Sequence, residues 1–132
     1  MDNIELVKLA IEAKKFAHVP YSHFKVGAAL LTKSGEVFKG ANIECSSFGM
    51  TVCAERTALV KAVSEGYKEF TKIAVVGGME DELTFTTPCG ACRQFLADFN
   101  QDMDVVMGYL ENGKIKCKVM KLNELLPATF EF

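Results

Sequence analysis

Three cysteines and one glutamate stand in positions that suit zinc chemistry. Residues 51–58 read TVCAERTA and residues 87–94 read TPCGACRQ, and in each stretch a cysteine stands where a helix is expected to begin. Three thiolates leave one position of a tetrahedral zinc ion open, which is the arrangement of a hydrolytic site. The carboxylate of Glu55 follows the first of these cysteines by two residues. It could move protons for water held at the open position.

The spacing of the cysteines allows them to converge. Cys89 and Cys92 are three residues apart, so on a helix their sulfurs lie on one face and reach the same ion. Cys53 opens another helix in the same way, and the positive N-terminus of a helix favours thiolate over thiol. If the two helix starts lie side by side at the ends of neighbouring strands, where open α/β sheets form binding sites, the three sulfurs meet.

Four further side chains are candidates for a fourth ligand: Cys45, Cys117, His18 and His23. None has ligand spacing, and a cysteine in a strand commonly packs as a small hydrophobic residue. We therefore expect three protein ligands plus water, and one Zn²⁺ per subunit. A glutamate in a first helical turn also has a structural role open to it, because it complements the helix dipole. Its place beside the cysteine pattern favours the catalytic interpretation of Glu55.

Three thiolates carry more negative charge than Zn²⁺ carries positive charge, which makes water at the ion less acidic. Arg56 follows Glu55 directly, and Arg93 follows Cys92 directly. We expect at least one of these arginines to donate hydrogen bonds to a ligand sulfur and withdraw charge from it. A solvated arginine near a helix end is the alternative for each.

The elements that must position these residues follow from hydrophobic spacing. The sequence predicts a helix over 1–19, strands over 24–31 and 37–41, a helix over 52–65, a strand over 72–77, a helix over 89–99, strands over 103–109 and 115–120, and a helical turn over 121–126. The apolar run at 73–76 has no polar alternation and suggests burial on both faces. Helices between strands favour an α/β fold with three α/β/α layers and a mixed five-stranded sheet, as one domain over 1–132.

Composition narrows the class of partner. The chain has 132 residues, 49% of them hydrophobic and 24% charged, with a net charge of −2. A negative net charge argues against a nucleic acid partner, because a protein that binds nucleic acid needs a positively charged surface. No apolar run approaches the roughly 18 residues of a membrane span, and the acidic start is not the pattern of a signal peptide. An odd number of cysteines, five, fits a cytoplasmic location better than a disulfide framework.

The two cysteine stretches resemble the zinc-deaminase signature in its three-cysteine form. Further stretches, PYSHFKVGAAL at 20–30, GANIE at 40–44 and ELLP at 124–127, are similar to cytidine deaminases of the small homotetrameric type. The resemblance covers nearly the whole chain. It implies hydrolytic deamination of cytidine and 2′-deoxycytidine to uridine and 2′-deoxyuridine plus ammonia, in pyrimidine salvage, by a cytoplasmic homotetramer.

The resemblance also implies how the reactive residues act. Cys53, Cys89 and Cys92 would hold zinc. Glu55 would take a proton from water, deliver it to N3 of the cytosine ring, and then protonate the leaving amino group after attack at C4.

Substrate contacts are implied in the same way. The backbone N–H of Ala54 would bond the base, Phe24 would lie against the pyrimidine ring, and Asn42 and Glu44 would bind the ribose 3′-hydroxyl. Phe130 would enter the site of a neighbouring subunit, so that sites are completed across subunit interfaces. A carboxylate near the sugar repels a 5′-phosphate, which favours a nucleoside over a nucleotide.

Two other functions remain open from the sequence. One is deamination of a cytosine-bearing antibiotic of the blasticidin S type, against which the sugar-reading pair Asn42 and Glu44 argues. The other is a zinc-stabilised binding module without catalysis. Glu55 and the count of three ligands argue against that module.

Overall fold

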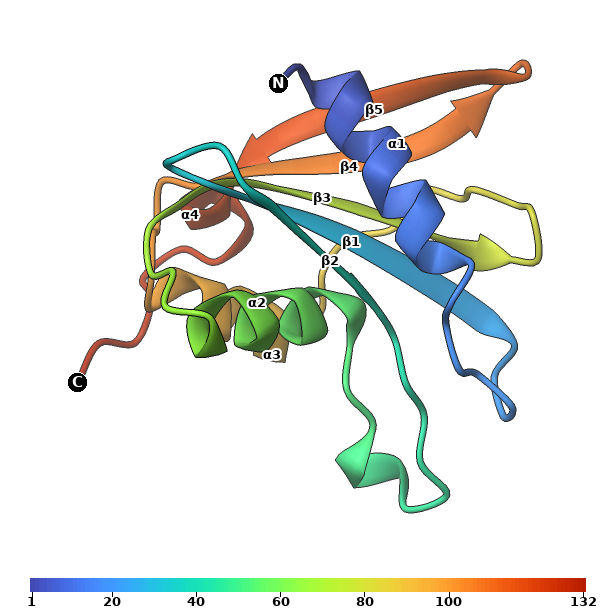
Figure 1. The fold of residues 1–132 in the computed structure, drawn as a ribbon, viewed down its shortest axis with the longest axis horizontal. Helices are drawn as coiled ribbons and strands as arrows, with labels where there is room; N and C mark the ends of the chain where they lie inside the picture. The colour runs from blue at the N-terminus through green and yellow to red at the C-terminus, as the bar shows by residue number, and fades with distance from the viewer.

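The computed structural model describes residues 1–132 as a five-stranded sheet with helices on both of its faces (Figure 1). The elements, in order, are α1 (Asn3–Lys14), β1 (Phe24–Thr32), β2 (Val37–Ala41), the 3₁₀ turn η1 (Phe48–Met50), α2 (Ala54–Ser64), β3 (Phe70–Met79), α3 (Gly90–Ala97), β4 (Asp104–Glu111), β5 (Lys114–Lys121) and α4 (Leu122–Leu125). The predicted fold class and order of elements are confirmed.

The sheet is mixed, with strand order β2-β1-β3-β4-β5. β1 pairs antiparallel with both β2 and β3, β3 pairs parallel with β4, and β4 pairs antiparallel with β5. The apolar run at 73–76 lies in the middle strand and is fully buried, as predicted. Its side chains alternate between the two faces: Ile73 and Val75 belong to one core cluster, and Ala74 and Val76 to the other.

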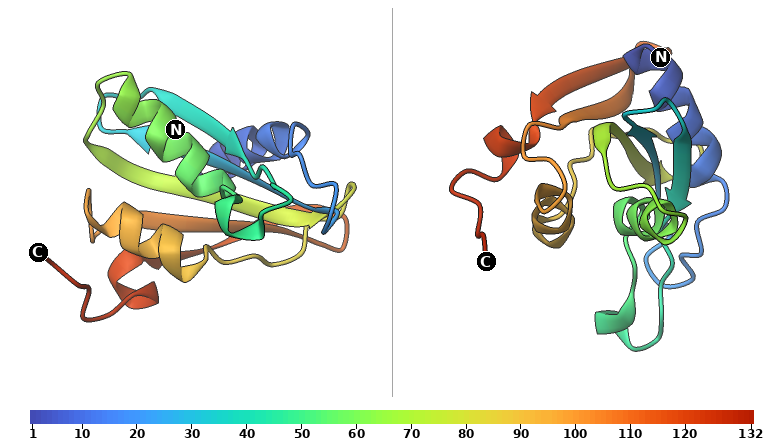
Figure 2. Two further views of the ribbon diagram at one scale, coloured as in Figure 1. Left: turned by 90° about the horizontal axis from the view of Figure 1, so that it is seen from below. Right: turned by 60° about the vertical axis from the view of Figure 1, so that its left-hand side comes forward.

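The two faces carry different helices (Figure 2). α1 packs on one face through Leu6, Val7 and Ala10. α2 and α3 lie next to each other on the opposite face, and α2 packs against the sheet through Ala58 and Leu59. None of these helices combines the length and the apolar character needed to cross a membrane.

The boundaries of the helices have local causes. α1 begins with a capping box, in which Asp2 accepts from the N–H of Glu5 and Glu5 accepts from the N–H of Asp2. α1 ends at Lys14, whereas the sequence predicted a helix to residue 19. The N–H of His18 instead donates to Asn42 O (2.9 Å), so pairing with a distant segment ends the helix early. α2 ends before Gly66, whose φ of +97° suits a residue without a side chain.

Two glycines let the helices approach the sheet closely. A Cβ at Gly27 of β1 would lie 2.1 Å from Ala10 O in α1. A Cβ at Gly40 of β2 would lie 2.5 Å from both Ala54 O and Ala58 N in α2. The first turn of α2 therefore rests directly on the backbone of β2.

Candidate active site

The three predicted zinc ligands come from the starts of two helices. Cys53 is the N-cap residue of α2, and Cys89 is the N-cap residue of α3, with nearly the same extended backbone conformation (φ −70°, ψ 156° and φ −68°, ψ 166°). Cys92 follows in the first turn of α3 and is buried. The helices α2 and α3 lie on the same face of the sheet (Figure 2). Because their starts lie close together, the three thiols converge.

The distances between the sulfurs suit a zinc ion. Sγ of Cys53 lies 3.7 Å from Sγ of Cys89, and Sγ of Cys89 lies 3.4 Å from Sγ of Cys92. All three atoms lie within 4.8 Å of one another. Zinc–sulfur bonds of about 2.3 Å in a tetrahedron place the sulfurs about 3.8 Å apart, so small movements would complete the site. The cluster contains no fourth histidine, cysteine, aspartate or glutamate, and Cys45, Cys117, His18 and His23 lie outside it.

Arg56 reaches the cluster and Arg93 does not. Nη2 of Arg56 donates to Sγ of Cys53 (3.5 Å) and to Thr51 O (3.4 Å). Arg93 donates instead to two carbonyls, through Nε to Pro88 O (2.8 Å) and through Nη1 to Leu125 O (2.7 Å). Of the two arginines that the sequence left open, the structure therefore brings only Arg56 to a sulfur.

The environment of the thiols favours a thiolate at Cys53. A hydrogen bond from Cys92 and the guanidinium of Arg56 lower the pKa of Cys53 to about 5. The same hydrogen bond, burial and the nearby carboxyl of Glu55 raise the pKa of Cys92. Of these two thiols, Cys53 therefore loses its proton more readily. The positive N-terminus of α2 acts in the same direction.

Glu55 lies in the first turn of α2 and is only 3% exposed. Its Oε1 atom is buried and has no hydrogen-bond partner within the chain. Burial raises the pKa of Glu55 to about 7, and the negative charge at Cys53 adds to this effect. A carboxyl group with a pKa near neutrality can both accept and release a proton, which is the property of a general acid–base catalyst.

A cavity of about 230 Å³ opens beside these groups, where β1 begins and where β2 and β3 end. It is lined by Phe24, Val26, Asn42, Thr51, Cys53, Ala54, Glu55, Thr86, Thr87 and Cys89. The aromatic ring of Phe24 packs close to Gly77, where a Cβ would lie 3.0 Å from it. Sequence reasoning missed Val26, Thr51, Thr86 and Thr87. Thr51 and Thr87 carried a signal, because each stands two residues before a cysteine of the pattern, Cys53 and Cys89.

A second hollow of about 400 Å³ adjoins the first and shares Thr51 with it. It is lined by Tyr21, Ser22, Glu44, Phe48 and Thr51. The structure thus brings Phe24, Asn42 and Ala54 to the cavity beside the sulfurs and Glu44 to the neighbouring hollow. Phe130 lines neither of them and is 68% exposed.

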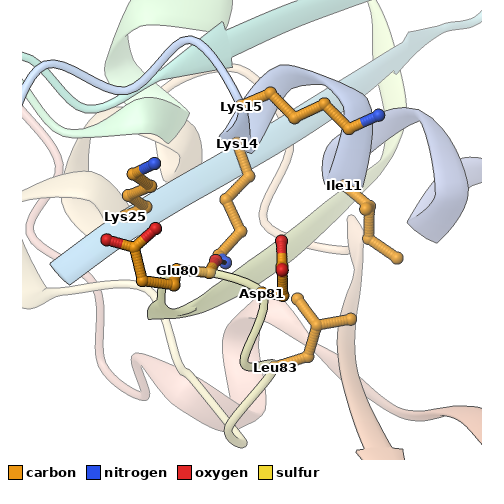
Figure 3. Close-up of a pocket in the computed structure, with 7 residues that line it drawn as sticks. All are labelled: Ile11, Lys14, Lys15, Lys25, Glu80, Asp81 and Leu83. Atoms are coloured by element: carbon orange, nitrogen blue, oxygen red, sulfur yellow. Dashed lines mark hydrogen bonds between the residues drawn. The ribbon is translucent and has the colours of Figure 1, made fainter.

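A third hollow lies at the end of α1, away from the sulfur cluster (Figure 3). It has a volume of about 160 Å³, and both lysines and acidic residues line it. Lys14 is only 4% exposed here and donates to the backbone carbonyl of Glu80, which fixes the turn after β3. Burial and the nearby charge of Lys25 lower the pKa of Lys14. This hollow shares no lining residue with the cavity beside the sulfurs.

Comparison with known proteins gives one family. Residues 1–109 match the family described as the cytidine and deoxycytidylate deaminase zinc-binding region. A cytidine deaminase of Halalkalibacterium halodurans is 50% identical over 131 residues, which cover 98% of this chain and 95% of the relative. A blasticidin-S deaminase of Bacillus cereus is 35% identical over 133 residues, which cover 97% of this chain and 91% of the relative.

The solved structures agree with the sequence comparison. The crystal structure of cytidine deaminase from Burkholderia pseudomallei matches with a TM-score of 0.87 and 42% identity, covering 98% of this chain and 100% of that one. These matches confirm the resemblance drawn from the sequence and the expected zinc cofactor. With its fold, its cluster of three thiols and its relatives in agreement, this chain belongs to the cytidine and deoxycytidylate deaminase family.

Proposed function

We propose that this protein catalyses the zinc-dependent hydrolytic deamination of cytidine and 2′-deoxycytidine, giving uridine and 2′-deoxyuridine plus ammonia. The observation that carries the proposal is the buried, unpartnered carboxyl oxygen of Glu55 beside three converging thiols. A buried polar atom without a partner costs about 1–3 kcal/mol, so a purely structural glutamate is a poor explanation for it. The relatives named cytidine deaminase support the choice of substrate.

Cys53, Cys89 and Cys92 would hold the ion as three thiolates. When bound, zinc supplies Lewis-acid activation of water at neutral pH. Arg56 offsets part of the excess negative charge through its hydrogen bond to Sγ of Cys53.

Glu55 carries the proton through the reaction. Its carboxylate takes a proton from the attacking water and delivers it to N3 of the cytosine ring while the oxygen bonds to C4. Glu55 then transfers the second proton of that water to the amino group on C4. The C–N bond breaks, ammonia leaves, and the C4 oxygen remains as the carbonyl of uracil. A pKa near neutrality suits both directions of transfer.

The remaining contacts select a nucleoside. Phe24 lies on the wall of the cavity, where its ring could pack against a pyrimidine. Ala54 is the first residue of α2, and the first N–H groups of a helix have no partner within the helix, so this donor is available to the base. Asn42 and Glu44 would bind the 3′-hydroxyl, the sugar extending from the cavity toward the adjoining hollow. The negative charge of Glu44 disfavours a 5′-phosphate.

We also propose the context in which the reaction occurs. Residues 1–132 would form one deaminase domain that assembles as a homotetramer, with the exposed Phe130 completing the site of a neighbouring subunit. All five cysteines are free thiols, which fits a reducing cytoplasm. The products would feed pyrimidine salvage.

Deamination of an antibiotic is the second candidate, because a blasticidin-S deaminase is also a relative, at lower identity. Turnover of cytidine and of blasticidin S by the same purified protein distinguishes the two substrates. Faster turnover of blasticidin S would move the proposed substrate to the antibiotic and leave the chemistry at C4 unchanged.

The decisive experiment follows the ultraviolet absorbance of cytidine as it becomes uridine. We expect Glu55→Ala to lose at least a hundredfold of turnover, the order of magnitude of general acid–base catalysis, while it keeps its zinc. A chelator should abolish the activity of the wild type, and added zinc should restore it. A zinc-stabilised binding module would give no turnover in the wild type and no loss of function in the variant.

A further inference from the structure

The hydroxyl group of Ser22 bonds both Glu44 and Phe24, the two residues proposed to contact the sugar and the base of the substrate. Oγ of Ser22 donates to Oε2 of Glu44 and accepts from the backbone N–H of Phe24 (3.0 Å). Glu44 is the proposed sugar-binding carboxylate, and Phe24 is the proposed wall of the base cavity. Ser22 itself lines the hollow that contains Glu44. The two sides of the substrate site therefore meet at a single oxygen atom.

The carboxylate of Glu44 is held by the segment that contains Ser22. Oε1 of Glu44 accepts from the backbone N–H of Tyr21 (3.0 Å) and from that of Ser22 (3.1 Å). With the hydroxyl of Ser22 on Oε2, three donors fix the orientation of the group, and two of them belong to Ser22. An ionised carboxylate has about four acceptor positions, so it retains capacity for a hydroxyl of the substrate.

Both the N–H and the carbonyl group of Phe24 form hydrogen bonds with side chains. Its N–H donates to Oγ of Ser22, and its carbonyl accepts from Nδ2 of Asn42 (3.0 Å). Oδ1 of Asn42 accepts in turn from the N–H of Val26 (2.9 Å). His23, between Ser22 and Phe24, has a φ of +60°, a conformation that a residue other than glycine adopts only when its surroundings hold it there.

We propose that Ser22 is a positioning residue that couples the sugar side of the site to the base side. This inference rests on the proposed function, because it takes Glu44 and Phe24 as substrate contacts. The hydroxyl keeps the carboxylate of Glu44 ionised and oriented, and it fixes the backbone from which the ring of Phe24 projects. Binding of the sugar and placement of the base are then supported by the same atom.

The electrostatics of Glu44 agree with this arrangement. The hydrogen bond from Ser22 is the largest cause that holds the pKa of Glu44 below its ordinary value. The backbone donors of Ser22 and Tyr21 and the charge of His23 act in the same direction, and desolvation opposes them. Loss of the hydroxyl should therefore raise the pKa of Glu44, so that protonation weakens sugar binding at a higher pH than in the wild type.

The chain contains a matched control for this test. Oγ of Ser34 donates to Oε2 of Glu36 in the turn between β1 and β2, so it forms the same kind of serine–glutamate pair on an exposed surface. Neither residue lines the cavity beside the sulfurs or the adjoining hollow. Ser34→Ala removes an equivalent hydroxyl without touching the proposed substrate contacts.

The experiment compares Ser22→Ala, Ser22→Thr and Ser34→Ala, each loaded with zinc, in steady-state turnover of cytidine. A hydrogen bond to a charged group corresponds to a change of roughly tenfold or more, so we expect Ser22→Ala to raise KM about tenfold with a much smaller change in kcat. The acid limb of kcat/KM should move to higher pH. Ser22→Thr, which keeps the hydroxyl, should restore KM, and Ser34→Ala should resemble the wild type.

A substrate without the 3′-hydroxyl tests the coupling to Glu44. The penalty of Ser22→Ala should shrink with 2′,3′-dideoxycytidine, and it should also shrink in the background of Glu44→Gln, because the coupled partner is then absent. An unchanged KM and pH profile in Ser22→Ala, or a penalty that is the same for both substrates and both backgrounds, would overturn the proposal. Absence of cytidine turnover in the wild type would instead refute the proposed function.

Discussion

Helix α2 lies directly against Gly40 of β2. A Cβ there would lie 2.5 Å from Ala54 O and from Ala58 N, whereas ordinary van der Waals contact begins at 3.4 Å. Both obstacles are backbone atoms, which cannot rotate away as a side chain can. Gly40→Ala should therefore push the first turn of α2 away from the sheet by about 0.9 Å, the difference between these two distances.

That displacement would act on the site directly, because Cys53 and Glu55 stand at the start of α2. Cys89 and Cys92 belong to α3 and would not move with them. A misplacement of about 1 Å can cost roughly a hundredfold in rate, and overpacking costs about 1–3 kcal/mol of stability. We expect Gly40→Ala to lose about two orders of magnitude in kcat and, at this chain length, roughly 5–10 °C in Tm.

Two other glycines provide the controls. Gly27→Ala creates a closer clash, 2.1 Å from Ala10 O, but on the opposite face, against α1. It should lower Tm at least as much and keep most of the turnover of the folded protein. Gly49→Ala places its Cβ in open space and should change neither quantity. Turnover and zinc content are measured at a temperature well below the unfolding transition, and Tm is measured separately by thermal unfolding. Equal losses of turnover in Gly27→Ala and Gly40→Ala, or full turnover in Gly40→Ala, would refute the reasoning.

Two further predictions concern single charged groups. Arg56→Gln removes the hydrogen bond to Sγ of Cys53, so zinc affinity should fall by about 10–100-fold in a chelator competition, and unchanged affinity and turnover would contradict that role. Hydrogen bonds from Ser34 and Thr32 lower the pKa of Glu36 below its ordinary value of 4.5, so their stabilisation is present above that pH and is lost as pH falls through the lowered pKa. The free energy of unfolding in urea is measured at about pH 6 and at about pH 3 for the wild type and for Glu36→Gln. It should fall less between these two pH values in the variant than in the wild type, and an equal fall in both proteins would exclude this account.

The parts of the structure that sequence reasoning captured depend on short-range patterns. The three-residue spacing of Cys89 and Cys92 and the apolar run at 73–76 each determine a local outcome, and the structure agrees with both. The early end of α1 depends on pairing of His18 with Asn42. The choice between Arg56 and Arg93 depends on which carbonyls lie nearby in space. Neither could be read from neighbouring residues.

The surroundings of the site show the same limit. Asn42 and Glu44 were assigned from a resemblance, but no pattern in the sequence indicates that Asn42 also bonds the backbone on both sides of Lys25, at Phe24 and Val26. The contact of Ser22 with Glu44 spans 22 residues. Thr51, which lines both hollows, lies in the irregular segment between η1 and α2, and such a segment has no periodicity from which the direction of a side chain could be inferred.

Arg93 gives the segment after α4 a mechanical connection to the thiols. A single planar guanidinium holds the carbonyl of Pro88, just before Cys89, and the carbonyl of Leu125 in α4. The directions of the N–H groups of the guanidinium are fixed relative to one another. A displacement of Leu125 would therefore also displace Pro88, the residue that precedes α3 and its N-cap Cys89. A force applied to the chain end is therefore transmitted to the residue before Cys89, a proposed zinc ligand, so a tag fused to the C-terminus should lower zinc affinity without contacting the ion.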